Sequence, residues 1–390
     1  MNELHIDKTH WKRTKIGDLL YKTEYNDKEN ASKQYSKFIK MEHLDANSLN
    51  IHRCGDSSVE DIPPTFYKIF KKGQILYPTR NPQLRRAALA SFDGICGEKT
   101  LTLSLIEGCE GYIPFIAHVF HSSAFIEYAT NARIGSTNPH IRWRDVADYE
   151  FLLPPKAEQK RLAELLWAAD EVVEKEKRER EKVEEYKYLL VSSTILNGYK
   201  TIVLNDLGKV IRGVSYKPEQ VKKEEDFDSF MLLRSNNISS NFTTNYDEVY
   251  FIDESILKNE QELQLGDIII CMSNGSKELV GKASEITALP TKKTSVGSFC
   301  AIFRSNPDAK ISKYLFQSIE YRKQIALLLS GSNINNLKPS DIESIAFNIK
   351  ANIETTTIDS LNTIDVILSR LFFQIEQSQQ IKQELIDKII

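Results

Sequence analysis

An internal repeat is the feature that most restricts what this chain of 390 residues can fold into. The stretch STNPHIRWRDVADYEFLLPPKAEQKRLAELL (136–166) is echoed much later by SNINNLKPSDIESIAFNIKANIETTTIDSL (332–361). At a constant offset of 196 (341 − 145), Asp145, Phe151, Leu153 and Glu158 correspond to Asp341, Phe347, Ile349 and Glu354. Four correspondences in one register, all leading into a helical pattern, indicate an internal duplication.

The repeat extends towards the start of each half. KIGDLL (15–20) resembles VLNDLG (203–208), FIKMEHL (38–44) resembles LLRSNNI (232–238), and KKGQILYPTRN (71–81) resembles QLGDIIICMSN (264–274). The offsets lie between 188 (206 − 18) and 196 and change in small steps, as loop insertions would cause. Each half therefore has about 150 residues of mixed structure, with short strands bounded by Gly and Pro, followed by one long helix.

Both long helices carry apolar residues at alternating steps of three and four. The first begins after Pro154-Pro155, because proline suits a helix entry and not its interior. The apolar positions are Leu162, Leu165, Ala169, Val172, Val183, Tyr186 and Leu190 in the first helix, and Leu361, Ile364, Leu368, Leu371, Ile375, Leu385 and Ile389 in the second. Polar residues interrupt both seams, Glu176 and Glu179 in the first helix and Ser378 and Lys382 in the second. This heptad pattern predicts that the two helices pair with each other. The alternative is two ordinary core helices, against which their length of about forty residues argues.

The sequence therefore predicts an α+β fold of two mixed α/β domains joined by two long antiparallel helices that form a coiled coil, with a pseudo-twofold internal repeat. The expected domains are residues 1–153, a central long helix at 154–198, a second globular block at 199–350, and a C-terminal helix at 351–390.

Composition restricts the class of protein. No run of about 18 apolar residues exists, and no apolar segment follows the N-terminus, so neither a membrane span nor a secretory signal is expected. The five cysteines are scattered and form no C-x-x-C pair, which predicts neither a disulfide framework nor a zinc ribbon and fits a reducing cytoplasm. The net charge of −3 argues against bulk nucleic-acid binding, although it permits a local basic cleft.

Two segments of the first half have the chemistry of a nucleic-acid contact. After the strand-like QILYP come Thr79, Arg80 and Asn81, then Arg85 and Arg86. Arginine can read guanine and asparagine adenine, while further arginines bind phosphate. The basic and aromatic mixture of Lys33, Tyr35 and Lys37 suits a phosphate backbone beside a ring. A solvated surface loop, or a loop that only supports the domain, is the alternative for each segment.

The second half has corresponding candidates. The loop after DIIIC contains Ser273, Asn274, Ser276 and Lys277. It nearly spells a phosphate loop, but Ser276 stands where that motif needs Gly and Ala283 where it needs Ser or Thr, so ATP binding is rejected. Further polar clusters contain Arg234 and Asn236, and Lys292 and Lys293. Plain surface is the alternative for all of them.

No catalytic constellation is visible. The seven histidines form no metal-ligand spacing, and His118 and His121, three apart on an expected helix, are interpreted as structural. Neither H-E-x-x-H nor G-x-S-x-G occurs, and the NPQL at Asn81 is not the N-P-P-[YF] of adenine methyltransferases. Any methyl-donor site is therefore expected on a partner.

Several stretches resemble the specificity subunits of type I restriction–modification enzymes. They are YPTRNPQLRRAALASFDGICGEKTLTL (77–103), GSTNPHIRW (135–143), LPPKAEQKRL (153–162) and IRGVSYK (211–217), and the resemblance includes the order of two globular blocks and two long helices. It implies that each block is a target-recognition domain that reads one half of a bipartite duplex DNA target. It also implies that the helices fix the spacing and dock two methyltransferase subunits, that restriction subunits join indirectly, and that S-adenosylmethionine, ATP and Mg bind to those partners.

The second half departs from the family pattern at its helix entry. Lys350-Ala351 stands in place of Pro154-Pro155, and Thr355 in place of Gln159. These departures put symmetric docking of the methyltransferases in doubt. Two other function classes remain: a standalone enzyme, which the missing catalytic residues disfavour, and a bivalent protein-binding spacer without DNA readout. DNA binding that falls steeply with salt would discriminate against the spacer, because counterion release marks phosphate contacts.

Overall fold

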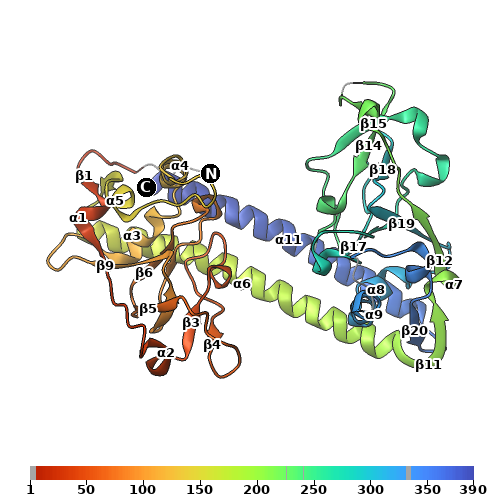
Figure 1. Ribbon diagram of the computed structural model, residues 1–390, viewed down its shortest axis with the longest axis horizontal. Helices are drawn as coiled ribbons and strands as arrows, with labels where there is room; N and C mark the ends of the chain where they lie inside the picture. Colours follow the sequence, from red (N-terminus) through yellow and green to blue (C-terminus); the bar gives the residue numbers. More distant parts are fainter. Residues whose placement is uncertain (1–5, 225, 240, 331–334) are drawn as a thin grey trace. The chain divides into compact units, whose positions relative to one another are not determined.

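The computed structural model describes residues 6–224, 226–239, 241–330 and 335–390, so the Ser-Asn pair that begins the second repeat stretch lies outside the described residues. The chain divides into two compact units (Figure 1). Unit 1 contains Met1–Arg180 and Arg370–Ile390, and unit 2 contains Glu181–Ser369. Each long helix therefore contributes one part to each unit.

Unit 1 is a mixed α/β domain built on two four-stranded sheets and one two-stranded sheet. Its strands are β1 (Lys12–Lys15), β2 (Leu20–Lys22), β3 (Lys37–Ile39), β4 (Gly55–Asp56), β5 (Phe66–Phe70), β6 (Ile75–Pro78), β7 (Ala88–Leu89), β8 (Gly94–Gly97), β9 (Thr100–Leu105) and β10 (Glu150–Leu153). Its short helices are α1 (Ile16–Leu19), α2 (Ala31–Gln34), α3 (Ile113–Val119), α4 (Ser123–Asn131) and α5 (Trp143–Ala147). The strand orders are β2-β9-β6-β7, β4-β3-β8-β5 and β1-β10.

Unit 2 has the same kinds of element in nearly the same order. Its strands are β11 (Leu196–Val203), β12 (Gly208–Arg212), β13 (Val221–Lys222), β14 (Ser229–Leu233), β15 (Tyr250–Asp253), β16 (Ile268–Cys271), β17 (Ala283–Glu285), β18 (Thr294–Val296), β19 (Cys300–Ser305) and β20 (Ala346–Ile349). Its helices are α7 (Leu204–Leu207), α8 (Ser312–Phe316), α9 (Ile319–Ser330) and α10 (Pro339–Glu343). The strand orders are β12-β19-β16-β17, β13-β15-β14-β18 and β11-β20.

The topology confirms the internal repeat. The order β12-β19-β16-β17 repeats β2-β9-β6-β7, and each unit has one parallel pair, β3 with β8 and β14 with β18. Local details repeat as well. Asp18 accepts a hydrogen bond from the backbone N of Lys15 at 3.2 Å, and Asp206 accepts the corresponding bond from Val203 at 3.0 Å. The units differ in their other four-stranded sheet, where β13 and β15 of unit 2 replace the arrangement of β4 and β5.

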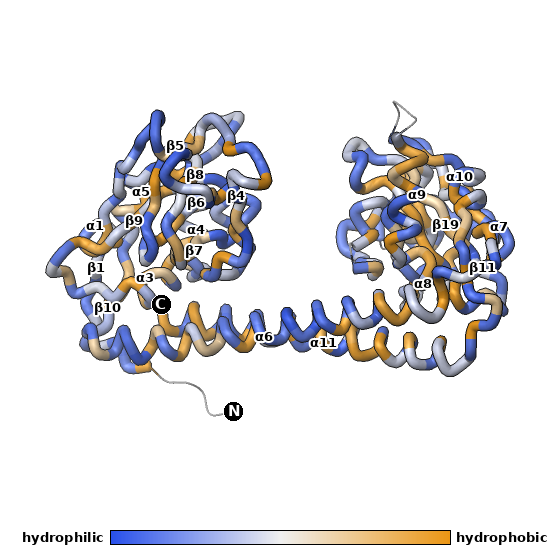
Figure 2. The backbone as a smooth tube through the Cα atoms, turned by 90° about the horizontal axis from the view of Figure 1, so that it is seen from below, coloured by the Kyte–Doolittle hydropathy of each residue, from blue (hydrophilic) through white to orange (hydrophobic). Residues whose placement is uncertain are grey.

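The two long helices are α6 (Lys156–Thr194) and α11 (Thr355–Ile389). Within unit 1 they pair antiparallel, because Asp170 contacts Lys382 while Glu176, further along α6, contacts Gln374, which is earlier in α11. Within unit 2, Lys187 contacts Asp365. The predicted antiparallel pairing of long helices is confirmed, as is the expected start after Pro154-Pro155. Figure 2 shows the hydrophilic middle of α6, where the sequence reads EKEKRERE.

The predicted seam of α11 is confirmed. That of α6 is confirmed at Val183 and Leu190, which pack against the core of unit 2, and is wrong by one residue at other positions. In α11, the predicted positions Leu361, Ile364, Ile375, Lys382 and Ile389 are all buried. In α6, the predicted Leu165, Val172 and Tyr186 are 42%, 51% and 59% exposed. The buried positions of α6 come one residue later and include Ala163, Leu166, Asp170, Val173 and Val191. A search for apolar residues misses this seam because buried Asp170 lies on it.

Asp170 is tolerated in the seam because its charge is fully paired. Lys382 Nζ donates to Asp170 Oδ1 at 2.8 Å, and both side chains are only 4% exposed. His118 Nε2 lies 3.2 Å from the other carboxylate oxygen. Burial alone would raise the pKa of Asp170, but the hydrogen bond to His118 and the charge of Lys382 outweigh it and hold this pKa below its usual value. This pairing agrees with the structural role expected of His118.

The ion pair of unit 1 has a counterpart in unit 2. Asp365 follows Asp170 by 195 positions (365 − 170), and Lys382 follows Lys187 by the same number (382 − 187). In unit 2, however, the Lys187 and Asp365 side chains are 12% and 25% exposed, and Lys313 also lies 2.9 Å from Asp365. The corresponding pair in unit 2 is thus more exposed to solvent, and its carboxylate has a second lysine as a partner.

No helix among the described residues is both long and apolar enough to cross a membrane. All five cysteines are unpaired, and Cys54 is exposed.

Candidate functional site

In unit 2, three strand ends meet at one edge. β14 and β18 are parallel, with Leu233 beside Val296, so both strands end at this edge. β16 is antiparallel to β19, with Cys271 beside Cys300, which brings the end of β16 to the same place. The segments 234–237, 272–279 and 297–299 therefore lie together, and we call them loop edge 2. Figure 1 shows β14, β18 and β19 close to one another in unit 2.

Hydrogen bonds hold the three segments of loop edge 2 in place. The backbone N atoms of Met272 and Ser273 both donate to Phe299 O, at 2.8 and 3.1 Å. Asn274 Nδ2 donates to Ser235 Oγ at 3.3 Å. The loop that follows β16 is thus connected to both other segments.

Unit 1 repeats this arrangement. β3 and β8 are parallel, with Ile39 beside Cys96, and the end of β6 lies beside the start of β9, with Pro78 opposite Thr100. The segments 40–43, 79–86 and 98–99 form the equivalent loop edge 1. Thr79 donates to Lys99 O through its backbone N at 2.9 Å and its hydroxyl at 3.0 Å. Arg86 Nη1 donates to Met41 O at 3.4 Å.

The structure divides the sequence-predicted residues into two sets. Eleven lie on the loop edges: Thr79, Arg80, Asn81, Arg85 and Arg86 in unit 1, and Arg234, Asn236, Ser273, Asn274, Ser276 and Lys277 in unit 2. The other five precede a strand that ends at a loop edge: Lys33, Tyr35 and Lys37 lie at or before the start of β3, and Lys292 and Lys293 come just before β18. These five therefore lie towards the opposite end of their sheets. DNA contact stays a prediction for both sets.

Several of the predicted side chains already have partners inside their unit. Thr79 is buried, and Arg85 donates to His121 O and, at 3.0 Å, to Ser123 Oγ. Lys292 Nζ donates to Glu224 O, Asp226 O and Ser229 Oγ at 2.7, 2.8 and 2.7 Å. Lys293 is paired with Glu254 at 2.7 Å. Such side chains stabilise the domain in which they lie.

The remaining side chains of the loop edges are available to a ligand. Asn81, Asn236, Ser276 and Lys277 are exposed. In the described part of the chain, the buried Nε atoms of three loop-edge arginines, Arg80, Arg86 and Arg234, have no hydrogen-bond partner. These Nε atoms are enclosed by the protein, so the groups that a ligand can reach are the exposed polar side chains of each loop edge.

Sequence reasoning missed two residues of the loop edges, Lys99 and Phe299. Each is the last residue of its loop segment, Lys99 just before β9 and Phe299 just before β19, and each is exposed. Their carbonyls accept the hydrogen bonds from Thr79 and from Met272. No sequence signal indicated these positions, because their place at the site depends on the pairing of β8 and β18 with distant strands.

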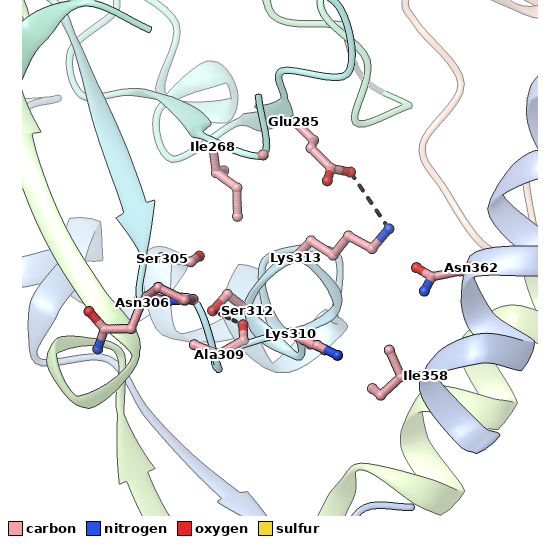
Figure 3. Close-up of a pocket in the computed structure, with 12 residues that line it drawn as sticks. Ile268, Glu285, Ser305, Asn306, Ala309, Lys310, Ser312, Lys313, Ile358 and Asn362 are labelled. Carbon is pink, nitrogen blue, oxygen red and sulfur yellow. Dashed lines mark hydrogen bonds and ion pairs between the residues drawn. The ribbon is translucent and has the colours of Figure 1, made fainter. Parts of the chain in front are cut away.

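Unit 2 also contains an open pocket of about 250 Å³ (Figure 3). Its lining includes Glu285, Lys313 and Asn362, with Lys313 Nζ 3.8 Å from the Glu285 carboxylate. Burial raises the pKa of Glu285, and the positive charge of Lys313 opposes this shift. Gly266, before β16, and Ser305, at the end of β19, also line it, so the pocket is at the opposite end of these strands from loop edge 2.

The connection beside this pocket is shorter than its counterpart in unit 1. Ser305 is 11 residues before Phe316, whereas Leu105 is 15 residues before the equivalent Phe120 (316 − 305 and 120 − 105). Accordingly α8 has 5 residues and α3 has 7.

Comparison with known proteins finds similar proteins for the first half. The family model described as type I restriction modification DNA specificity domain matches residues 8–185. The specificity subunit of type I restriction enzyme StySPI from Salmonella potsdam is 33% identical over 190 residues, which cover 47% of this chain and 40% of that protein. The specificity subunit of type I restriction enzyme EcoKI from Escherichia coli (strain K12) is 32% identical over 193 residues, 48% of this chain and 40% of that protein. The match thus spans about two fifths of the length of these curated relatives.

Solved structures extend the similarity to both units. The S subunit of a type I restriction-modification system from M. genitalium is 17% identical, with a TM-score of 0.50 over 99% of this chain and 98% of that one. A chain from a structure of a type I R-M system, described for its complex assembly and conformational transition, is 16% identical, with a TM-score of 0.50 over 97% of both chains. Residues 8–185 are therefore similar to the type I restriction modification DNA specificity domain, and the chain as a whole has the fold of a type I restriction-modification S subunit.

Proposed function

We propose that this chain is the DNA-recognition subunit of a type I restriction–modification complex and that each unit reads one half of a bipartite duplex target. The observation that carries the proposal is the loop edge, which occurs in both units and presents exposed polar side chains. Methylation and cleavage belong to partner subunits, and the chain itself supplies sequence readout.

The side chains of the loop edges suit the edges of bases. Asn81 in unit 1 and Asn236 in unit 2 are exposed amides, which can pair with adenine through a donor and an acceptor. Arg80 in unit 1 and Arg234 in unit 2 supply guanidinium groups, which favour guanine or phosphate. Arg234 stacks over the Tyr250 ring at 4.0 Å, which orients its guanidinium group. Because the net charge is −3, recognition must depend on such local groups.

Methylation mapping tests the function directly. Genomic DNA from cells carrying the complete operon should contain methylated bases in a motif of two short specific parts and a non-specific gap. Deleting the gene of this chain should abolish that methylation. A continuous motif, or methylation that persists after the deletion, would contradict the proposal.

We further propose that two methyltransferase subunits dock on the outer faces of α6 and α11. In unit 1, Leu165, Val172, Phe373 and Ile381 are exposed apolar residues of these helices, and unit 2 exposes Tyr186, Leu189, Val366 and Ile367. Exposed apolar groups that gather on one surface favour a protein partner. Replacing Leu165 and Val172 with glutamate should lower the methyltransferase-to-chain ratio on co-purification towards one, with thermal stability unchanged. An unchanged ratio would exclude this surface as a docking site.

Lys277 and Lys292 should respond differently to substitution. Lys277 is exposed on loop edge 2, so Lys277→Ala should weaken binding to all duplexes alike, reduce the salt slope of binding by about one, and leave stability unchanged. Lys292 donates three internal hydrogen bonds, so Lys292→Met should lower the free energy of unfolding by about 1–3 kcal/mol. DNA titrations at several salt concentrations and thermal melts would measure both. A salt slope unchanged in Lys277→Ala would remove Lys277 from the interface.

A further inference from the structure

The last residues of the two loop edges are equivalent positions with opposite chemistry. Gly97-Glu98-Lys99-Thr100 and Gly297-Ser298-Phe299-Cys300 align at an offset of 200 (299 − 99), and β9 and β19 follow at once. The Lys99 carbonyl accepts from the backbone N of Thr79, and the Phe299 carbonyl accepts from that of Met272. The repeat therefore places a flexible cation in unit 1 where unit 2 has an apolar ring.

The backbone on which Phe299 lies is firmly held. Besides the two bonds that its carbonyl accepts, Cys300 N donates to Gly297 O and Gly297 N donates to Leu233 O, both at 2.8 Å. Unit 1 fixes its own turn by other means, since Lys68 Nζ donates to Glu98 O at 3.1 Å and Thr100 O at 2.9 Å. Both loop edges thus present their last side chain from a rigid turn.

Phe299 is 68% exposed, although hydrogen bonds hold both its carbonyl and the backbone N of Cys300, which follows it. Loop edge 2 also carries the polar Ser273, Asn274 and Ser276. Burial of a large exposed apolar ring against an apolar surface is favourable. On duplex DNA, the faces of the bases and the thymine methyl group offer such a surface, and phosphates do not.

We propose that Phe299 makes an apolar contact with a base in the half-site read by unit 2, whereas Lys99 contacts a phosphate in the other half-site. This inference rests on the proposed function, because it needs the loop edges to face DNA. If so, the two units contact DNA at this position through different kinds of interaction. The contact of unit 1 at this position is electrostatic and salt-dependent, while that of unit 2 is apolar and depends on sequence.

The test uses the full chain co-purified with its methyltransferase partner and a duplex that carries the target found by methylation mapping. Phe299→Ala should weaken binding about tenfold, corresponding to ~1.4 kcal/mol, at the low end of what stacked aromatic contacts contribute. Its salt slope should equal that of the wild type. Phe227→Ala is the matched control, because Phe227 is 101% exposed but precedes β14 and so lies at the opposite end of that strand from loop edge 2. Binding by this control should remain unchanged.

Lys99→Ala should instead reduce the salt slope by about one and weaken binding to all duplexes alike, and Lys99→Arg should restore both. Two modified duplexes define the contact made by Phe299. Replacing thymines of its half-site with uracil should reproduce the loss if the ring meets a methyl group. An increase in 2-aminopurine fluorescence on binding, absent in Phe299→Ala, should appear if the ring enters the base stack.

Equal binding by Phe299→Ala and the wild type would overturn the inference, as would a lowered salt slope in this variant. Loss of binding together with a lower melting temperature would also overturn it, because the ring would then support the fold. Failure of the wild-type complex to bind the mapped duplex would refute the proposed function itself. Wild-type binding with an unaffected Phe299→Ala would refute only the inference.

Discussion

Replacing Lys382 with methionine should lower the free energy of unfolding of unit 1 by about 3–5 kcal/mol, the usual cost of leaving one charge of a buried ion pair without its partner. Methionine nearly preserves the length of the side chain, so the loss is electrostatic. It removes the donor to Asp170, whose side chain is 4% exposed, and to Asn47 O. Chemical denaturation followed by a probe in unit 1, such as the fluorescence of Trp167, would measure the change.

Lys187→Met in unit 2 is the matched control. Its ion pair with Asp365 has the corresponding position, but both side chains are more exposed and Asp365 retains Lys313 as a partner. The expected loss is about 1 kcal/mol or less. Equal losses in the two variants would show that burial does not determine the strength of these pairs.

The effect of Lys382→Met should depend on pH in a defined direction. The pKa of Asp170 is lowered in the folded state, so the stability from its charged form is present above the ordinary value of 3.8. That stability is lost as pH falls through the lowered folded-state pKa. In Lys382→Met burial is no longer opposed by the charge of Lys382, so Asp170 takes up its proton at a higher pH than in the wild type. The difference between wild type and variant should therefore diminish as pH falls. A difference that grows as pH falls would implicate another group.

Lengthening both long helices should move the two half-sites apart. Four residues inserted between Arg180 and Glu181, and four between Ser369 and Arg370, add about 6 Å at 1.5 Å per residue, or close to two base pairs. The insertions also turn one unit by about 40° relative to its previous orientation. Methylation of the original target should be lost, and a motif with the same half-sites and a gap longer by about two base pairs should appear.

These insertion points follow from the structure. The stretch between Glu174 and Arg180 is polar in sequence, but it is a poor place for an insertion, because Glu174 and Glu176 are buried and paired with His52 and Gln374. The unit boundaries leave both Asp–Lys pairs within their units. Four residues inserted after Ser136, in the exposed loop between α4 and α5, serve as the control and should leave the gap unchanged. An unchanged gap in the helix variant would show that the helices do not set the spacing.

Much of the fold could be predicted from the sequence, because short sequence motifs that form the same local structure occur in both halves. The turn before β6 recurs before β16, with Gly73 and Gly266 both at positive φ, and Asp18 recurs as Asp206 at the start of a short helix. The seam of α6 could not be predicted in this way. Asp170 looks like a surface residue until Lys382, more than 200 residues later, is brought to it.

The candidate site was only partly predictable for a similar reason. Arg80, Asn81 and Lys277 belong to residue types that suit DNA, and the structure places them on the loop edges. Residue type could not separate them from Lys292, whose ammonium group is enclosed by two carbonyls and a hydroxyl. Phe299 is an ordinary apolar residue in the sequence, and only the antiparallel pairing of β16 with β19 places it beside Ser273.

Because unit 1 is discontinuous in sequence, synthesis by the ribosome affects the two units differently. Unit 2 is complete once Ser369 has been made, whereas unit 1 needs Lys382, Ile386 and Ile389 to neutralise Asp170 and close its core. Although unit 1 begins first, it must therefore finish folding last, and until then the nascent chain carries an unpaired carboxylate and an uncovered apolar surface. Premature termination between Ser369 and Lys382 would thus leave a folded second unit attached to an incomplete first one, which is a substrate for proteases and chaperones.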